Sequence, residues 1–126
     1  MKPETAEWIE KAEGDWKVAQ RESQAADPVW NVVCFLAQQC AEKYLKAFLE
    51  EQNIAFQKTH DLVALFNLSG GRLAELEPLR PELARLSTLG IAARYPGAYA
   101  DREAAEDAMR IANKVQAVIK GKLALL

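Results

Sequence analysis

The chain has 126 residues, half of them hydrophobic and 27% charged, with a formal net charge of −2 at pH 7. This length fits a single domain over 1–126, and the balanced charge argues against a protein that wraps duplex DNA, which needs a strongly basic face. A membrane span would require a run of about 18 apolar residues, and the sequence contains none. The first residues also lack the apolar region of a signal peptide. We therefore expect a cytoplasmic protein that binds neither a membrane nor a specific duplex DNA sequence.

A first helix is predicted from Glu4 to Ser23. Trp8, Ala12, Trp16 and Ala19 recur every three or four residues, which is the spacing of one helix face. We expect this face, including the tryptophans, to pack in the core.

A second helix is predicted from Asp27 to Glu51. Asp27 is a good N-cap, and Pro28 suits the first helical position because its missing N–H needs no partner. Its apolar ridge repeats every four residues: Val32, Leu36, Cys40, Tyr44 and Phe48. So wide a stripe indicates contact with more than one neighbouring helix.

The polar residues of the second helix are expected on a solvated face. Glu42 and Lys46 are four residues apart and can pair, whereas Lys43 lies on a different side. Cys34 and Cys40 are six residues apart, a rotation of about 240° that excludes a disulfide within the helix. Two cysteines and one histidine cannot form a Cys/His zinc site without carboxylates, and we expect no metal or other cofactor.

Shorter elements follow. Residues 53–58 read as a connection, and Thr59 is a plausible cap for a short helix from His60 to Leu68. Pro78 disturbs the next segment, and a further helix is predicted from Pro81 to Ile91.

The last helix is predicted to begin after a turn at Pro96-Gly97. Proline fixes φ there and glycine tolerates a positive φ, while Asp101 can cap the helix that runs to about Ala124. Its expected buried stripe is Ala104, Ala108, Ile111, Val115 and Val118. The apolar C-terminus, which either packs on its own bundle or joins a dimer contact, consists of Leu123, Leu125 and Leu126. Four main helices and one short helix with mostly short connections predict an all-α, antiparallel up-down bundle.

Several segments in this layout resemble the HEPN family of small all-helical proteins. The resemblance covers nearly the whole chain and depends on the Trp8–Ala12–Ala19 stripe and three motifs. These are Gln39-Cys40-Ala41-Glu42-Lys43-Tyr44-Leu45-Lys46-Ala47, Thr59-His60-Asp61-Leu62 and Ala93-Arg94-Tyr95-Pro96-Gly97. The resemblance implies a bundle similar to the helical C-terminal domain of kanamycin nucleotidyltransferase. It also implies homodimers and a separately encoded small nucleotidyltransferase as partner, often as a toxin–antitoxin pair.

Many HEPN proteins are metal-independent ribonucleases with an Arg-x(4–6)-His motif near the last helix. In that chemistry arginine stabilises the charge on phosphate, and histidine moves the proton of the 2′-OH. This chain departs from the motif. The allowed positions hold Tyr99, Ala100 and Asp101 after Arg94, and Asp107, Ala108 and Met109 after Arg102. Ribonuclease activity is therefore an alternative that requires His60 to be brought beside Arg94 by a neighbouring helix or a dimer contact.

Arg94 and Tyr95 are the first candidates for a binding site. A guanidinium can hold phosphate through two hydrogen bonds and a tyrosine face can stack a base. The alternative is that Arg94 caps the carbonyls of the preceding helix while Tyr95 packs. Tyr99 and Arg102 flank the N-terminus of the last helix, which attracts anions, although Asp101 competes there.

Lys43 joins these candidates if the helices cross so that it nears Arg94. His60, Asp61 and Glu42 are secondary candidates, although a helix cap is the simpler role for Asp61. The sequence thus predicts a nucleotide- or RNA-binding helical module that works with a nucleotidyltransferase. The alternatives are a metal-independent endoribonuclease and a protein-interaction subunit with no small ligand.

Overall fold

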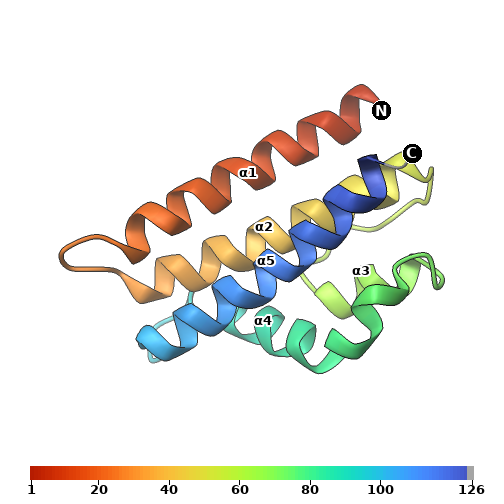
Figure 1. Cartoon of the computed structure of the whole chain (residues 1–126). Coiled ribbons are helices and arrows are strands. Elements are labelled where there is room, and N and C mark those ends of the chain that lie inside the picture. The colour runs from red at the N-terminus through yellow and green to blue at the C-terminus, as the bar shows by residue number, and fades with distance from the viewer. Residues whose placement is uncertain (125–126) are drawn as a thin grey trace.

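The computed structural model describes residues 1–124, and this part of the chain is helical without a strand. The elements are α1 (Pro3–Ser23), α2 (Trp30–Glu51), α3 (Leu62–Leu68), the 3₁₀ helix η1 (Ala74–Leu79), α4 (Arg80–Ala92) and α5 (Arg102–Ala124). The four long helices alternate in direction along the chain (Figure 1), so the predicted all-α architecture is confirmed. None of these helices combines the length and the hydropathy that crossing a membrane requires.

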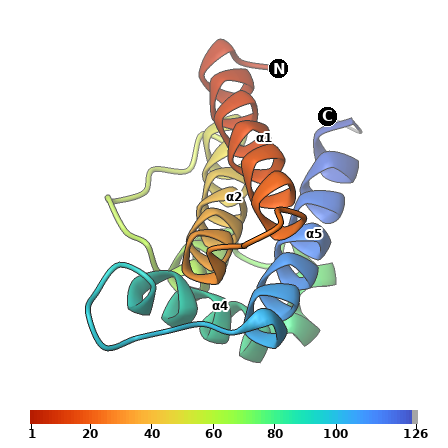
Figure 2. The ribbon, with the colours of Figure 1, turned by 90° about the vertical axis from the view of Figure 1, so that its left-hand side faces the viewer.

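Helix α2 is the centre of the bundle. It packs against α1, α4 and α5, which lie around it in Figure 2. Thirteen of its 22 residues are buried, more than one apolar stripe could account for. The width of the predicted stripe therefore indicated its several neighbours correctly, although Val32, the first residue of the predicted ridge, is exposed.

The predicted start of α2 at Asp27 is wrong. The helix begins at Trp30, and its N-cap, Val29, makes no side-chain capping bond. The carboxylate of Glu22 instead accepts a hydrogen bond from the backbone N–H of Val29 at 2.9 Å. A side chain from the end of α1 thus holds the entry to α2, a contact that local sequence does not reveal.

The predicted start of the short helix is also wrong. Helix α3 begins at Leu62, and Asp61 is its N-cap. The Asp61 carboxylate accepts hydrogen bonds from the N–H groups of Val63 and Ala64 at 3.0 and 3.2 Å. Thr59 acts one step earlier, where its hydroxyl accepts a hydrogen bond from the Asp61 N–H. Asp61 rather than Thr59 is the N-cap because a negative charge is stabilised at a helix N-terminus.

The remaining sequence predictions for the core are mostly confirmed, except that the tryptophans of α1 are only half-buried: Trp16 packs against the core, whereas Trp8 lines a surface cavity. Cys34 and Cys40 are free and buried, and burial raises the pKa of these thiols to about 11 and about 12. Asp101 caps α5 through a 2.8 Å hydrogen bond from the Ala104 N–H. Leu123 is buried, while the other two leucines of the predicted apolar C-terminus lie outside the described residues.

Helices α2 and α4 approach closely at Gly90. A Cβ atom on Gly90 would lie 2.4 Å from Cγ and 2.6 Å from Cβ of Gln38, which is fully buried. These Gln38 atoms lie near its backbone, and its amide is fixed by hydrogen bonds, so the side chain cannot move aside. Glycine is therefore required for this helix contact.

We predict that Gly90→Ala lowers the free energy of unfolding by about 1–3 kcal/mol, because the extra methyl group overpacks the α2–α4 contact. Gly14→Ala is the matched control, since nothing lies within 4 Å of the added Cβ. In an open helical position alanine is favoured over glycine by about 0.5–1 kcal/mol. Urea denaturation would measure both variants, and equal or greater stability of Gly90→Ala would contradict the close approach.

Candidate functional site

A buried carboxylate, Glu42, organises the polar interior of the bundle. Only 4% of its side chain is exposed. One oxygen, Oε2, accepts a hydrogen bond from Lys46 Nζ at 2.9 Å, and the other, Oε1, accepts one from Gln38 Nε2 at 3.0 Å and lies 2.8 Å from His60 Nδ1. Burial alone would raise the pKa of this carboxyl, but the hydrogen bonds from Lys46, Gln38 and His60 outweigh it and lower the pKa. Glu42 is therefore ionised in the folded chain.

The prediction that Glu42 and Lys46 lie on a solvated face is wrong, although their pairing is confirmed. Both side chains are buried. The Lys46 ammonium lies 5.5 Å from the ring centroid of Trp8 and 5.9 Å from that of Phe56, and these two rings contact each other edge to face. Helix α1 and the α2–α3 connection thus cover this part of α2, and the aromatic faces help to offset the cost of burying the cation.

His60 is fixed at the rim of this network. Its backbone carbonyl accepts a hydrogen bond from Gln38 Nε2 at 3.0 Å, and its ring nitrogen Nδ1 contacts Glu42. Because an ionised carboxylate can only accept, the imidazole carries its proton on Nδ1 when it is neutral. The other nitrogen, Nε2, has no hydrogen-bond partner among residues 1–124, and 54% of the His60 side chain is exposed.

Arg94 has an open guanidinium. Its Cζ atom lies 4.6 Å from the ring centroid of Phe35, and the side chain is exposed. Within the described part of the chain it makes no side-chain hydrogen bond and no ion pair. The alternative in which Arg94 caps the carbonyls of α4 is therefore not what the structure adopts.

The connection that carries Arg94, residues 93–101, is held to α2 by Asn31. The amide of Asn31 donates to the carbonyl of Ala98 at 3.0 Å and accepts from the N–H of Ala100 at 2.6 Å. Gly97 has the predicted positive φ, 88°. Sequence reasoning missed the Asn31 contact and had no local signal for it, since 67 residues separate this asparagine from Ala98.

His60 and Arg94 lie on one face of α2. Their contact residues, Glu42 and Phe35, are seven positions apart, which is almost two helical turns and about 10 Å along the axis. Gln39 lies between them, one turn from Phe35. Figure 2 shows the α2–α3 and α4–α5 connections projecting on the same side of the bundle. We name the surface formed by Phe35, Gln39, His60 and Arg94 the Arg94–His60 face.

The other predicted site residues lie around this face or away from it. Tyr95 and Tyr99 are exposed on the same connection as Arg94, at 63% and 88%. Lys43 points toward α1, where its ammonium pairs with Asp15 at 2.6 Å, so the structure does not bring it to Arg94.

Arg102 resembles Arg94 in its surroundings: it is exposed, its guanidinium lies 5.4 Å from the ring centroid of Trp30, and it makes no side-chain hydrogen bond to the described residues. The secondary candidate Asp61, in contrast, is used in the fold. Asp61 caps α3, and Asp101 caps α5, so the carboxylate expected to compete for anions at the start of α5 does occupy that position.

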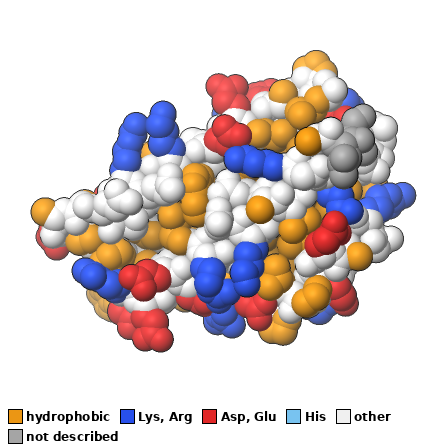
Figure 3. All heavy atoms as spheres, viewed as in Figure 1, with side chains coloured by type: hydrophobic (Ala, Val, Ile, Leu, Met, Phe, Trp, Pro, Cys, Tyr) orange, Lys and Arg blue, Asp and Glu red, His pale blue; other side chains and the backbone are white. Residues whose placement is uncertain are grey.

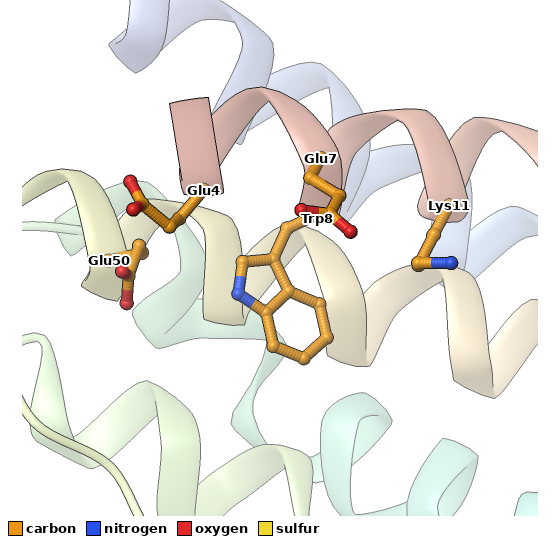
Figure 4. Close-up of a pocket in the computed structure, with 5 residues that line it drawn as sticks. All are labelled: Glu4, Glu7, Trp8, Lys11 and Glu50. Atoms are coloured by element: carbon orange, nitrogen blue, oxygen red, sulfur yellow. The ribbon is translucent and has the colours of Figure 1, made fainter. Parts of the chain in front are cut away.

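The cavity beside Trp8 does not suit a phosphate. It has a volume of about 330 Å³ and is lined by Glu4, Glu7, Trp8, Lys11 and Glu50. Figure 4 shows the indole with Glu4 and Glu50 toward one end and Lys11 toward the other. Three carboxylates against one ammonium give the cavity a negative charge, which repels an anion.

The opposite surface of the bundle, over α5, offers no continuous basic region among the described residues either. Figure 3 shows acidic and basic side chains interspersed there. Several are paired, including Arg85 with Asp107 at 2.7 Å and Lys122 with Glu75 at 2.9 Å. Paired charges of this kind leave little potential to attract a phosphate.

We predict that Glu42→Gln lowers the free energy of unfolding by about 3 kcal/mol at pH 7, because it leaves the buried Lys46 ammonium without a counter-charge. The folded pKa of Glu42 lies below the unfolded value of about 4.3, so its contribution is present above that pH and is lost as the pH falls through the folded pKa. Stability should therefore fall less steeply on acidification in the variant than in the wild type.

Glu75→Gln is the matched control for this experiment. It breaks a Lys–Glu pair of the same 2.9 Å length, but at the surface, and should leave stability nearly unchanged. Chemical denaturation between pH 3 and 7 would compare the three proteins. Equal stability of the two variants would show that the Glu42 network does not hold the fold together.

Comparison with known proteins agrees with this architecture. A sequence model of the HEPN domain matches residues 5–122. The structure of TT1696 from Thermus thermophilus superposes with a TM-score of 0.75 and 26% identity, covering 94% of this chain and 97% of that one. ST0689, an archaeal HEPN homologue, superposes with a TM-score of 0.72 and 25% identity, covering 97% and 98%. No curated protein gives a significant match. The resemblance noted in the sequence is thus confirmed, and this chain belongs to the HEPN domain family.

Proposed function

We propose that this HEPN domain is a cytoplasmic nucleotide- or RNA-binding module that holds a phosphate group through Arg94. The observation that carries the proposal is the open guanidinium of Arg94: the side chain is exposed, lies over the Phe35 ring and donates no hydrogen bond to the described residues. A guanidinium whose donors are already used by its own chain could not bind a ligand, whereas this one offers all of them.

The surroundings of Arg94 support a nucleotide more than a bare anion. Contact with the Phe35 ring restrains the Arg94 side chain, so it loses less conformational freedom when it binds phosphate. Tyr95 and Tyr99 provide exposed aromatic faces on the same connection, and a base can stack on such a face. The nearby N-terminus of α5 contributes little to phosphate binding, because the Asp101 carboxylate already accepts a hydrogen bond there.

We further propose that the module forms a homodimer and works with a separately encoded small nucleotidyltransferase as one half of a toxin–antitoxin pair. Membership of the HEPN family supports this partnership.

We predict that Arg94→Ala weakens binding of ATP and of a ten-residue oligouridylate by about tenfold or more, because a hydrogen-bonded charge pair is lost. The slope of log K against log[salt] for oligouridylate binding should also become shallower, by the amount that one phosphate contact contributes. Isothermal titration calorimetry at about 0.15 M salt, the physiological ionic strength, would measure both.

Arg85→Ala is the control variant. It removes the same charge, but from a guanidinium already bonded to Asp107, and should leave affinity unchanged. If neither ligand binds the wild type, or if the two variants behave alike, Arg94 is not the phosphate site. Complex formation with a small nucleotidyltransferase of the same genome, but without nucleotide affinity, would instead favour a protein-interaction subunit.

A further inference from the structure

A second cavity lies at the end of the bundle where α5 begins. It has a volume of about 510 Å³, which is within the usual size of small-molecule sites. Its walls come from the C-terminal end of α1, the α1–α2 connection, the first residue of α2 and one face of α5. Figures 1 and 2 show these segments together at that end of the bundle. The candidate phosphate site is separate from this cavity, since neither Arg94 nor Phe35 lines it.

The two charged side chains of the cavity, Arg102 and Glu106, have opposite signs and do not pair with each other. Both lie on α5, four residues apart, and both are exposed. Neither makes an ion pair or a side-chain hydrogen bond within the described part of the chain. The Arg102 guanidinium instead lies 5.4 Å from the ring centroid of Trp30, which forms another wall. An acidic residue that follows its basic partner is also the weaker order for a pair along a helix, so both charges stay available.

The neighbouring carboxylate, Asp101, does not belong to this cavity. It accepts a hydrogen bond from the Ala104 N–H as the cap of α5, and it borders a separate hollow beside α4. The acidic side chain that lines the cavity is therefore that of Glu106 alone. One positive and one negative group in the same cavity suit a ligand that carries both charges itself.

The charges of the cavity distinguish Arg102 from Arg94 in the anion that each suits. A phosphate monoester carries about two negative charges at pH 7, and one guanidinium neutralises one of them. The remaining charge would lie close to Glu106 and to the carbonyl end of α1, which both repel an anion. A carboxylate carries a single charge and matches a guanidinium through two hydrogen bonds. The cavity therefore favours a carboxylate over a phosphate monoester at Arg102.

The rest of the cavity supplies the complement of an ammonium group and of an apolar side chain. The last turn of α1 borders the cavity at Gln20 and Ser23, so the negative end of that helix and Glu106 together attract a cation. Trp30 and Met109, both half-buried, form an apolar part of the wall. A carboxylate, an ammonium group and an apolar side chain on one carbon atom are the parts of an α-amino acid.

We propose that this cavity binds a free α-amino acid with an apolar side chain. Arg102 holds the carboxylate, Glu106 and the carbonyl end of α1 hold the ammonium group, and the ligand side chain lies against Trp30 and Met109. The proposal does not depend on phosphate binding at Arg94, because the two places have no residue in common.

Calorimetric titration with L-phenylalanine and two truncated analogues tests each charge. We expect the wild type to bind L-phenylalanine with a dissociation constant of about 1 mM or lower, which a ligand of this size can reach. 3-Phenylpropionate lacks the ammonium group and phenethylamine lacks the carboxylate. Each analogue should bind about tenfold more weakly, because one hydrogen-bonded charge pair is lost.

Two substitutions assign the two charges to their residues. Arg102→Gln should bind L-phenylalanine no more tightly than phenethylamine, and Glu106→Gln should lose most of the preference over 3-phenylpropionate. Both side chains are exposed, so the fold should persist, which circular dichroism would check. Arg110→Gln and Glu103→Gln are the matched controls, since they remove the same charges from α5 outside the cavity and should leave all three affinities unchanged.

The position of the ligand is tested by the Trp30 indole N–H signal of ¹⁵N-labelled protein, which should shift on titration with L-phenylalanine. An unmoved Trp30 signal, absence of binding by the wild type, or equal affinity of the wild type and Arg102→Gln would overturn the proposal. Binding of inorganic phosphate that is lost in Arg102→Gln, without binding of L-phenylalanine, would also overturn it. None of these outcomes bears on Arg94, which the oligouridylate titration tests separately.

Discussion

The ionised Glu42 carboxylate is the interaction on which the rest of the structure depends. A charge this deeply buried is tolerated only when both oxygens are satisfied, and Lys46, Gln38 and His60 together satisfy them. Each partner ties a different part of the chain to α2. Lys46 brings in Trp8 of α1 and the ring of Phe56, and His60 fixes the connection to α3.

The same network links stability to recognition. Gln38 uses its amide to hold His60 and its stem to pack against Gly90 of α4, the helix that leads directly into the Arg94 connection. Arg94, which we assign to ligand binding, and its neighbour on this face, His60, are therefore positioned by one helix through separate contacts. Rigid presentation of this kind reduces the entropy that binding costs.

Local chemistry predicted much of the fold, and tertiary contacts account for most of what it missed. Helix periodicity located the four long helices, and the roles of Asp101 and Gly97 followed from capping and turn preferences. The start of α2 was missed because Glu22, seven residues away from Val29, supplies the bond that Asp27 was expected to make. Lys46 was placed in solvent because nothing local shows that Trp8 and Phe56 will cover it.

In the candidate site, too, the sequence indicated candidate residues but not their tertiary contacts. The motif around Arg94 was selected from the sequence. That the Arg94 guanidinium is open was not predicted, because it depends on contacts with Phe35 and on the loop contact made by Asn31. Lys43 was selected for its charge and is instead paired with Asp15 on α1. His60 and Glu42 were secondary candidates whose contact appears only when the α2–α3 connection folds back onto α2.

The central claim is that ligand binds at the Arg94–His60 face and not in the acidic cavity beside Trp8. Nuclear magnetic resonance with ¹⁵N-labelled protein tests it directly, because the Arg94 Nε–H and the Trp8 indole N–H report on the two places in one spectrum. On titration with an oligouridylate, our account predicts a shift of the Arg94 signal while the Trp8 signal stays unmoved. A shift of the Trp8 signal with an unchanged Arg94 signal would contradict it.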